Sequence, residues 1–204
     1  MIKALIFDFG NVLVRTQTRA FRHKWDDKLG LAHGTAEETV FNSERGRASQ
    51  HGQHTEEEHW LWVGDHFKLT PAELTQFRLD FWAGDALDGQ LISMIDKWRP
   101  QYKTAIISNA MDGLRHDLDN KWGIAFAFDE IVVSAEFGTM KPDPSIYHHA
   151  LERVGVQASE AIFIDDFAHN IEAAEAVGLH GIHYPPTKTR AELLAELERL
   201  QIQV

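Results

Sequence analysis

Polar residues that could do chemistry follow several short apolar runs of this sequence, each near the point where the run ends. Asp8 follows the first run, Ser108-Asn109 and Asp165-Asp166 follow two later runs, and Lys141 comes one loop after another. Neighbouring carboxylates repel each other unless a cation lies between them, and oxygen ligands of this kind suit Mg²⁺. An aspartate beside a metal ion, a lysine and a hydroxyl donor can carry out phosphoryl transfer, which depends mainly on positioning and charge neutralisation.

The apolar runs predict the strands that position these residues. Runs of four or five apolar residues without alternation are typical of strands buried on both faces of a parallel sheet. We expect such strands at 3–7, 104–107, 130–133, 161–164 and 181–184. Segments with one apolar helical face lie between most of them, and this alternation predicts an α/β fold with a Rossmann-like, doubly wound parallel sheet. Ligands bind at the carboxyl ends of such strands, where the polar residues meet.

Residues 16–84 have a different character, with many charges, four of the six tryptophans and no convincing strand. We interpret them as a helical insertion into an α/β core formed by residues 1–15 and 85–204. A Thr followed three residues later by a Glu predicts a capping box at a helix start. This pattern occurs at Thr35/Glu38, Thr55/Glu58, Thr70/Glu73 and Thr189/Glu192.

Composition excludes several classes of protein. The net charge of −11 argues against binding to nucleic acid or to an anionic membrane, since both need a basic surface. The absence of cysteine excludes disulfides, thiolate catalysis and cysteine-ligated metals. No window reaches the roughly 18 apolar residues of a membrane span, and the N-terminal run makes a poor signal peptide because Asp8 interrupts it. We therefore expect a soluble cytoplasmic protein.

Histidines are frequent between residues 51 and 66, and they could suggest a metal site. His51, His54, His59 and His66 are spaced by 3, 5 and 7 residues, which does not keep them on one helical face. The surrounding stretch is strongly charged, so we expect these histidines on a solvated surface.

Four motifs, FDFGNVL, ISNA, KPDPSIY and FIDDFAHN, occur in an order and spacing that resemble the haloacid dehalogenase-like (HAD) superfamily. The resemblance spans essentially the whole chain, and it identifies residues 16–84 as a helical cap inserted after the first motif. The DFGNV start, the Glu44 to Gly46 stretch and the paired aspartates are most similar to the branch that holds sugar-1-phosphate phosphatases and the N-terminal phosphatase domain of soluble epoxide hydrolase.

The resemblance implies a role for each residue that matches a motif. Asp8 would be the nucleophile that forms an aspartyl-phosphate, which water then hydrolyses. Ser108 would donate a hydrogen bond to a phosphoryl oxygen with the Asn109 amide nearby, and Lys141 would neutralise the phosphate and the nucleophile.

The metal ligands follow from the same resemblance. Asp166 would hold Mg²⁺ together with Asp8 and the backbone carbonyl of Gly10, and Asp165 would contribute directly or through water. Asn170 stands where many relatives carry a further acidic residue, so it would orient other groups.

Gly10 departs from the phosphatase pattern, in which a second Asp serves as general acid and base. General acid–base catalysis typically contributes about 10²–10⁴-fold to the rate. Three interpretations stay open: a leaving group that needs little protonation, a proton supplied by a cap residue or by water, or weak catalysis. The first agrees with an anomeric sugar hydroxyl as the leaving group.

The predicted function is Mg²⁺-dependent hydrolysis of a small phosphorylated metabolite, either a sugar phosphate in general or a sugar 1-phosphate, by a monomer or homodimer. A 2-haloacid dehalogenase would share the fold and the nucleophile, but it needs no metal and has no use for Asp165-Asp166. A phosphomutase would need the missing acid even more. A non-catalytic phospho-accepting module is the remaining alternative.

Overall fold

The computed structural model describes residues 1–203. Five parallel strands form the central sheet in the order β5-β4-β1-β6-β7, so that β1 pairs with both β4 and β6. All five lie within one residue of the predicted strands, and the predicted α/β class is confirmed. The strands are β1 (Ala4–Phe7), β4 (Lys103–Ser108), β5 (Glu130–Val133), β6 (Ala161–Asp165) and β7 (His180–His183).

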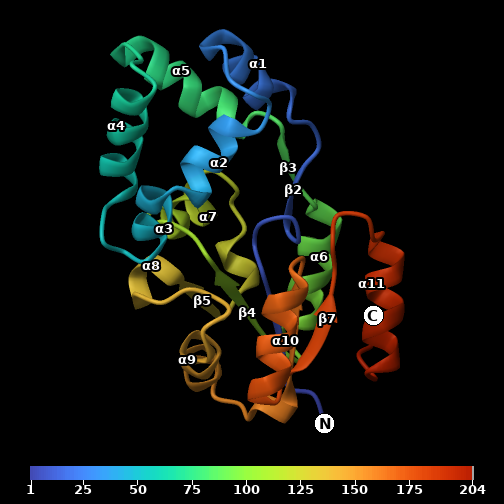
Figure 1. Cartoon of the computed structure of the whole chain (residues 1–204). Coiled ribbons are helices and arrows are strands. Elements are labelled where there is room, and N and C mark those ends of the chain that lie inside the picture. Colours follow the sequence, from blue (N-terminus) through green and yellow to red (C-terminus); the bar gives the residue numbers. More distant parts are fainter. Residues whose placement is uncertain (204) are drawn as a thin grey trace.

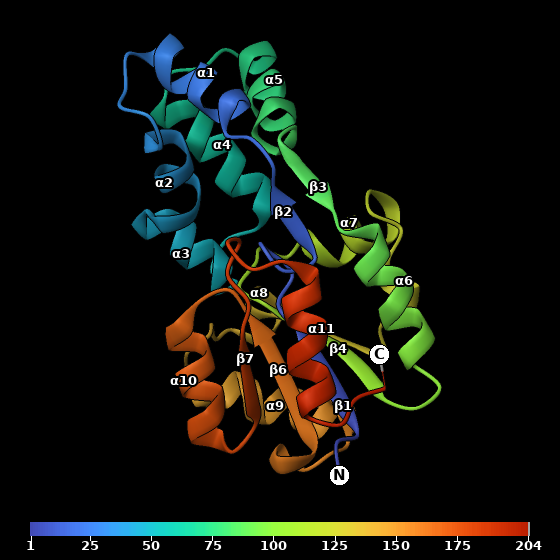
Figure 2. The same cartoon turned by 90° about the vertical axis from the view of Figure 1, so that its right-hand side faces the viewer.

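Helices cover both faces of the sheet (Figure 2). On one face pack α6 (Gly89–Trp98), α7 (Leu114–Asn120) and α11 (Arg190–Arg199), and on the other pack α9 (Pro144–Val154) and α10 (Ala168–Val177). Side chains alternate between two hydrophobic cores along β1, because successive residues of a strand point to opposite faces. The short elements are η1 (Ala125–Ala127), α8 (Ser134–Phe137) and η2 (Ala158–Glu160).

The cap helices between β2 (Val14–Thr16) and β3 (Asp85–Leu87) form a separate layer beyond the carboxyl ends of the sheet strands (Figure 1). Its helices are α1 (Ala20–Leu29), α2 (Thr35–Asn42), α3 (Glu44–Gln50), α4 (Glu56–His66) and α5 (Pro71–Trp82). They enclose their own aromatic core, in which Trp25 meets the edge of Phe77 at 5.2 Å between ring centroids, with Trp60 and Phe81 beside them. Within residues 1–203, no helix combines the length and apolarity needed to cross a membrane.

A two-stranded antiparallel ribbon joins the cap to the sheet. Val14 of β2 (Val14–Thr16) pairs with Leu87 of β3 (Asp85–Leu87), and Thr16 pairs with Asp85. The Thr16 hydroxyl donates a hydrogen bond to the Asp85 carboxylate at 2.7 Å. The sequence analysis missed both strands because three residues are too few to show a periodic pattern. The division of the chain at 15 and 85 stays a prediction.

Three of the four predicted capping boxes are confirmed, at Thr55, Thr70 and Thr189. The prediction at Thr35 is wrong, since the N-cap of α2 is Gly34, which has no side chain to accept a hydrogen bond. The buried carboxylate of Asp26, on the preceding helix, accepts the N–H groups of Gly34 and Ala36 at 2.8 Å each. A side chain that is distant in sequence therefore satisfies this helix start.

Candidate active site

The order of the strands brings the predicted site residues to one edge of the sheet. Asp8 directly follows β1, Ser108 ends β4 and Asp165 ends β6, and β1 lies between the other two strands. The Asp8 N–H donates a hydrogen bond to the Ile164 carbonyl at 2.8 Å, which continues the parallel ladder past the last residue of β1. The carboxyl ends of these three strands therefore present Asp8, Ser108 and the Asp165-Asp166 pair side by side.

Lys141 enters this edge from the loop before α9, and its ammonium group is buried. Its Nζ lies 2.8 Å from Asp8 Oδ1 and 2.6 Å from Asp165 Oδ2, and it donates to the Ile107 carbonyl at 3.0 Å. A buried ammonium is stable only with such partners. Lys141 therefore links the two buried carboxylates.

Asn109 fixes the backbone of Lys141. Its amide nitrogen donates to the Lys141 carbonyl at 2.9 Å, and its amide oxygen accepts the Lys141 N–H at 2.7 Å. This reciprocal pair occupies the amide group that the sequence analysis placed near the phosphate. In this structure the Asn109 side chain positions the lysine loop.

Asp165 is fully buried, and hydrogen bonds occupy both of its oxygens. Oδ1 accepts the Phe167 N–H at 2.8 Å, Oδ2 accepts Lys141 Nζ, and the Asn170 amide donates to both at 3.0 and 3.1 Å. Asn170 thus has the orienting contact expected for it. Asp165 anchors this network.

Asp166 differs from Asp165 because one of its oxygens is free. Asn11 Nδ2 donates to Oδ2 at 2.9 Å, whereas the buried Oδ1 has no hydrogen-bond partner among residues 1–203. A buried oxygen without a partner is costly, so it points to a missing ligand.

A divalent cation fits this arrangement. Asp8, Asp165 and Asp166 each offer a carboxylate oxygen, and these three oxygens lie within 4.8 Å of one another. Hard oxygen ligands of this kind suit Mg²⁺. Because the oxygens of Asp165 already accept hydrogen bonds, Asp166 and Asp8 are the better direct ligands.

Burial dominates the electrostatics of the site. It raises the pKa of Asp8 from 3.8 to about 7, against the opposing effect of Lys141 and with a further rise from Asp165. Burial also raises the pKa of Asp166. For Lys141 burial alone would lower the pKa, but the Asp8 and Asp165 carboxylates outweigh it, so the pKa is raised and the ammonium keeps its charge.

A cavity of about 820 Å³ lies between this edge and the cap. Its lining includes most of the predicted site residues: Asp8, Gly10, Ser108, Asn109, Lys141 and Asp166. Asp165 does not line it and acts from behind. A Cβ added to Gly10 would meet no atom within 4 Å, so the position of the missing acid is open space.

Two contacts hold the cap against the core. The Ser134 hydroxyl donates to the carbonyl of Gln50, at the end of α3, at 2.7 Å and accepts the Ala110 N–H at 3.0 Å. On another side, the N–H of Glu56 at the start of α4 donates to Asp112 Oδ1 at 2.7 Å. Both Ala110 and Asp112 belong to the segment that follows Ser108, so the cap is linked to the loop after β4 directly through Glu56 and indirectly through Ser134.

The histidines between 51 and 66 do not line the cavity. The expectation of a solvated surface is wrong for His59, which is fully buried and stacks on Trp62 at 5.7 Å between ring centroids. Burial lowers its pKa to about 4, so its ring is neutral near pH 7. The reason is the aromatic core of the cap, whose shape the charged local sequence does not reveal.

Two positioning residues were missed by the sequence analysis. Asn11 orients Asp166 and has a left-handed backbone with φ of 57°, and the Gly-Asn dipeptide at 10–11 is a recognisable turn signal. Ser134 carried no such signal, because its contacts join three segments that are distant in sequence.

Comparisons with known proteins agree with this geometry. The family model described as haloacid dehalogenase-like hydrolase matches residues 2–178. The sesquiterpene phosphatase astK of Aspergillus oryzae is 28% identical over 186 residues, covering 89% of each chain. Bifunctional epoxide hydrolase 2 of the mouse is 34% identical over 73 residues, which cover 36% of this chain and 13% of that protein.

Solved structures share the fold. A HAD family enzyme from Bacteroides thetaiotaomicron, in complex with magnesium and inorganic phosphate, superposes with a TM-score of 0.79 at 20% identity. The superposition covers 95% of this chain and 99% of that one.

Proposed function

The chain belongs to the haloacid dehalogenase-like hydrolase family, and on that premise we propose that it is a Mg²⁺-dependent phosphatase acting on a phosphomonoester of a small metabolite. The observation that carries the proposal is the cluster of Asp8, Asp166 and Lys141 at the floor of a cavity large enough for a metabolite, with the buried Asp165 bonded to Lys141 behind them. Positioning and charge neutralisation at such a floor are what phosphoryl transfer requires.

In this proposal Asp8 attacks phosphorus, the bond between phosphorus and the ester oxygen breaks, and an aspartyl-phosphate forms while the alcohol leaves with a proton taken from water. Lys141 keeps its proton and balances the charge of Asp8 and of the phosphoryl oxygens. The Ser108 hydroxyl donates a hydrogen bond to one of these oxygens, and Asn109 holds Lys141 in register. Water then attacks the aspartyl-phosphate, which releases inorganic phosphate and restores Asp8.

Mg²⁺ would be held by Asp8, Asp166 and the Gly10 carbonyl, with Asp165 supporting the site through its hydrogen bonds. When bound, it would neutralise the nucleophile and phosphate and favour the ionised form of Asp8. The free Oδ1 of Asp166 supports this assignment. Magnesium and phosphate in the structural relative agree with it.

A 2-haloacid dehalogenase is less well supported. It attacks carbon without a metal ion, and a carboxylate with a free buried oxygen next to the nucleophile would then only repel the substrate carboxylate. The named phosphatase relative also favours phosphate chemistry. A sugar phosphate as substrate, a cytoplasmic location and a monomeric or homodimeric state stay predictions.

Phosphate release from p-nitrophenyl phosphate tests the proposal, because this leaving group needs little protonation and does not depend on the acid missing at Gly10. We expect turnover that requires Mg²⁺, is lost with EDTA and is lost in Asp8→Asn. Asp119→Asn, which changes an exposed carboxylate on α7, is the matched control and should keep full activity. No turnover with any phosphate ester, or turnover that survives Asp8→Asn, would overturn the proposal.

A further inference from the structure

We infer that the substrate of this site is the phosphate ester of an uncharged, apolar alcohol rather than of a sugar. The inference rests on the proposed phosphatase function and concerns the part of the cavity that lies away from Asp8. It follows from the side chains that line this part, from the partners that its polar groups already have, and from its charge.

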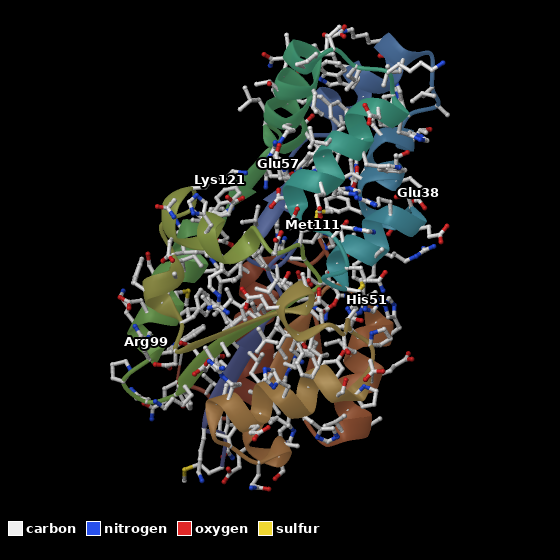
Figure 3. All side chains as sticks on the ribbon, turned by 90° about the vertical axis from the view of Figure 1, so that its left-hand side faces the viewer. Glu38, His51, Glu57, Arg99, Met111 and Lys121 are labelled. Atoms are coloured by element: carbon white, nitrogen blue, oxygen red, sulfur yellow. The ribbon has the colours of Figure 1, made fainter. Side chains whose placement is uncertain are left out.

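Apolar side chains from both halves of the molecule line the cavity. The core contributes Phe9, Met111 and Trp122, and the cap contributes Phe41 and Trp82. All five are half-buried, so part of each apolar surface stays available for contact. Figure 3 shows Met111 where the core faces the cap. Burying such surface against a ligand is favourable in proportion to the apolar area removed from water.

The aromatic side chains form two edge-to-face pairs. Phe9 and Trp122 lie 6.2 Å apart in the core, and Phe41 and Trp82 lie 5.8 Å apart in the cap. The Lys121 ammonium lies between the pairs, 5.1 Å from the Trp82 ring and 5.0 Å from the Trp122 ring. Cation–π contacts of this kind stabilise the two indoles where they line the cavity.

Two of the polar side chains that the cap contributes to the cavity are already paired within the protein. Arg22 bonds to Asp85 at 2.8 Å, to Glu37 at 3.1 Å and to the Phe81 carbonyl at 2.8 Å. The Gln50 amide donates to the Phe41 carbonyl at 2.7 Å. A sugar needs unpaired donors and acceptors for its hydroxyls, because a buried hydroxyl without a partner is costly.

The lining beyond the catalytic end also has no surplus of positive charge. Arg19, Arg47 and Lys121 are matched in number by Glu37, Glu38 and Asp117, and Arg19 pairs with Glu37 at 3.0 Å. The lining therefore offers no net positive charge to a second phosphate or a carboxylate on the substrate. An uncharged apolar group is the chemistry that fits a wall of aromatic rings in such a lining.

A homologous series of n-alkyl phosphates from butyl to octyl measures the contribution of this wall. Each methylene buried on binding should raise kcat/KM about fourfold, until the chain fills the cavity. Hexose 1- and 6-phosphates should be poorer substrates than octyl phosphate. The inference would be overturned if kcat/KM did not change with the length of the alkyl chain, or if hexose phosphates were the better substrates.

Variants show which side chains cause the increase in kcat/KM with chain length. Trp122→Ala should abolish most of this increase, and Trp122→Phe should largely restore it. Trp62→Ala is the matched control, because Trp62 is a half-buried indole that does not line the cavity, and it should keep the slope. An unchanged slope in Trp122→Ala would contradict the assigned wall.

The two proposals fail in different ways. Mg²⁺- and Asp8-dependent hydrolysis of p-nitrophenyl phosphate with a flat alkyl series would refute the apolar substrate and leave the phosphatase standing. Absence of phosphate release from every ester, p-nitrophenyl phosphate included, would refute the phosphatase and the substrate class with it.

Discussion

Replacing Gly10 by aspartate should supply the general acid that this chain lacks. A Cβ at this position would meet no atom within 4 Å, and the Gly10 backbone is outside the left-handed region, so a side chain fits without strain. Gly10 lines the same cavity as Asp8, two residues after it, so we expect a carboxyl added there to reach the leaving group. The substitution therefore tests whether proton donation limits the reaction.

The size of the gain depends on the leaving group. General acid–base catalysis typically contributes about 10²–10⁴-fold, and this factor applies only where the leaving oxygen must be protonated. The negative charge of Asp8 and Asp166 raises the pKa of a carboxyl added beside them, which helps it to hold its proton near neutral pH. We expect kcat for octyl phosphate to rise about 100-fold, the lower end of that range. We expect little change for p-nitrophenyl phosphate.

The assay compares kcat for both esters in wild type, Gly10→Asp and Gly10→Asn at saturating Mg²⁺ and near neutral pH. Asparagine has the size of aspartate but no acidic proton, so it separates protonation from steric effects. An equal gain for the two esters, or the same gain in Gly10→Asn, would show that the added side chain acts by another route. An unchanged kcat for octyl phosphate in Gly10→Asp would refute the idea that the missing acid limits turnover.

Burial raises the pKa of Asp8 in the folded state from 3.8 to about 7, so the folded state binds a proton that the unfolded state has already lost. The free energy of unfolding of the metal-free protein should therefore fall as the pH rises from about 4 to 7. Melting temperatures of wild type and Asp8→Asn in EDTA should diverge over this range, and Mg²⁺ should restore the wild type above pH 7; parallel curves would contradict this. The effect of His59 on stability has the opposite pH dependence. Burial lowers the pKa of His59 from 6.5 to about 4, so its contribution to the free energy of unfolding is present above pH 6.5 and is lost as the pH falls. In urea unfolding, the free energy of unfolding of His59→Phe should fall by about 1–2 kcal/mol less than that of the wild type between pH 7 and 5. An equal fall in both proteins would exclude His59 as the cause. Ser134→Ala leaves the Gln50 carbonyl without its donor, so it should cost about 1–3 kcal/mol in urea unfolding and raise KM more than it lowers kcat; unchanged values would mean that this link does not hold the cap.

The sheet was predictable because its strands are buried on both faces and therefore read as continuous apolar runs. Their parallel order then placed Asp8 between Ser108 and the Asp165-Asp166 pair with no further information. The predicted acidic group is present, and its members lie within reach of one cation. The roles assigned to these residues stay predictions until they are measured.

What the sequence could not show are contacts that depend on distant segments. Asp26 caps α2 in place of Thr35, and Ser134 joins the cap to the loop after β4. His59 lies in a charged stretch yet is enclosed by aromatic rings. The different environments of Asp165 and Asp166 were also hidden, because which oxygen stays free is decided by Asn11, Lys141 and Asn170.

The β2–β3 ribbon makes the helical layer interchangeable. Because Val14 pairs with Leu87 and Thr16 pairs with Asp85, the chain leaves the sheet and returns to it at the same place. The five helices connect β2 to β3 as a loop connects the two strands of a hairpin. Their length and sequence can therefore change without altering the register of β1 with β4 and β6 in the central sheet. A chimera that exchanges residues 17–84 between relatives would keep its nucleophile and lysine, and it would replace Phe41 and Trp82 of the cavity wall while Phe9, Met111 and Trp122 stay with the core. The cap's share of substrate choice can therefore change while the chemistry is inherited with the sheet.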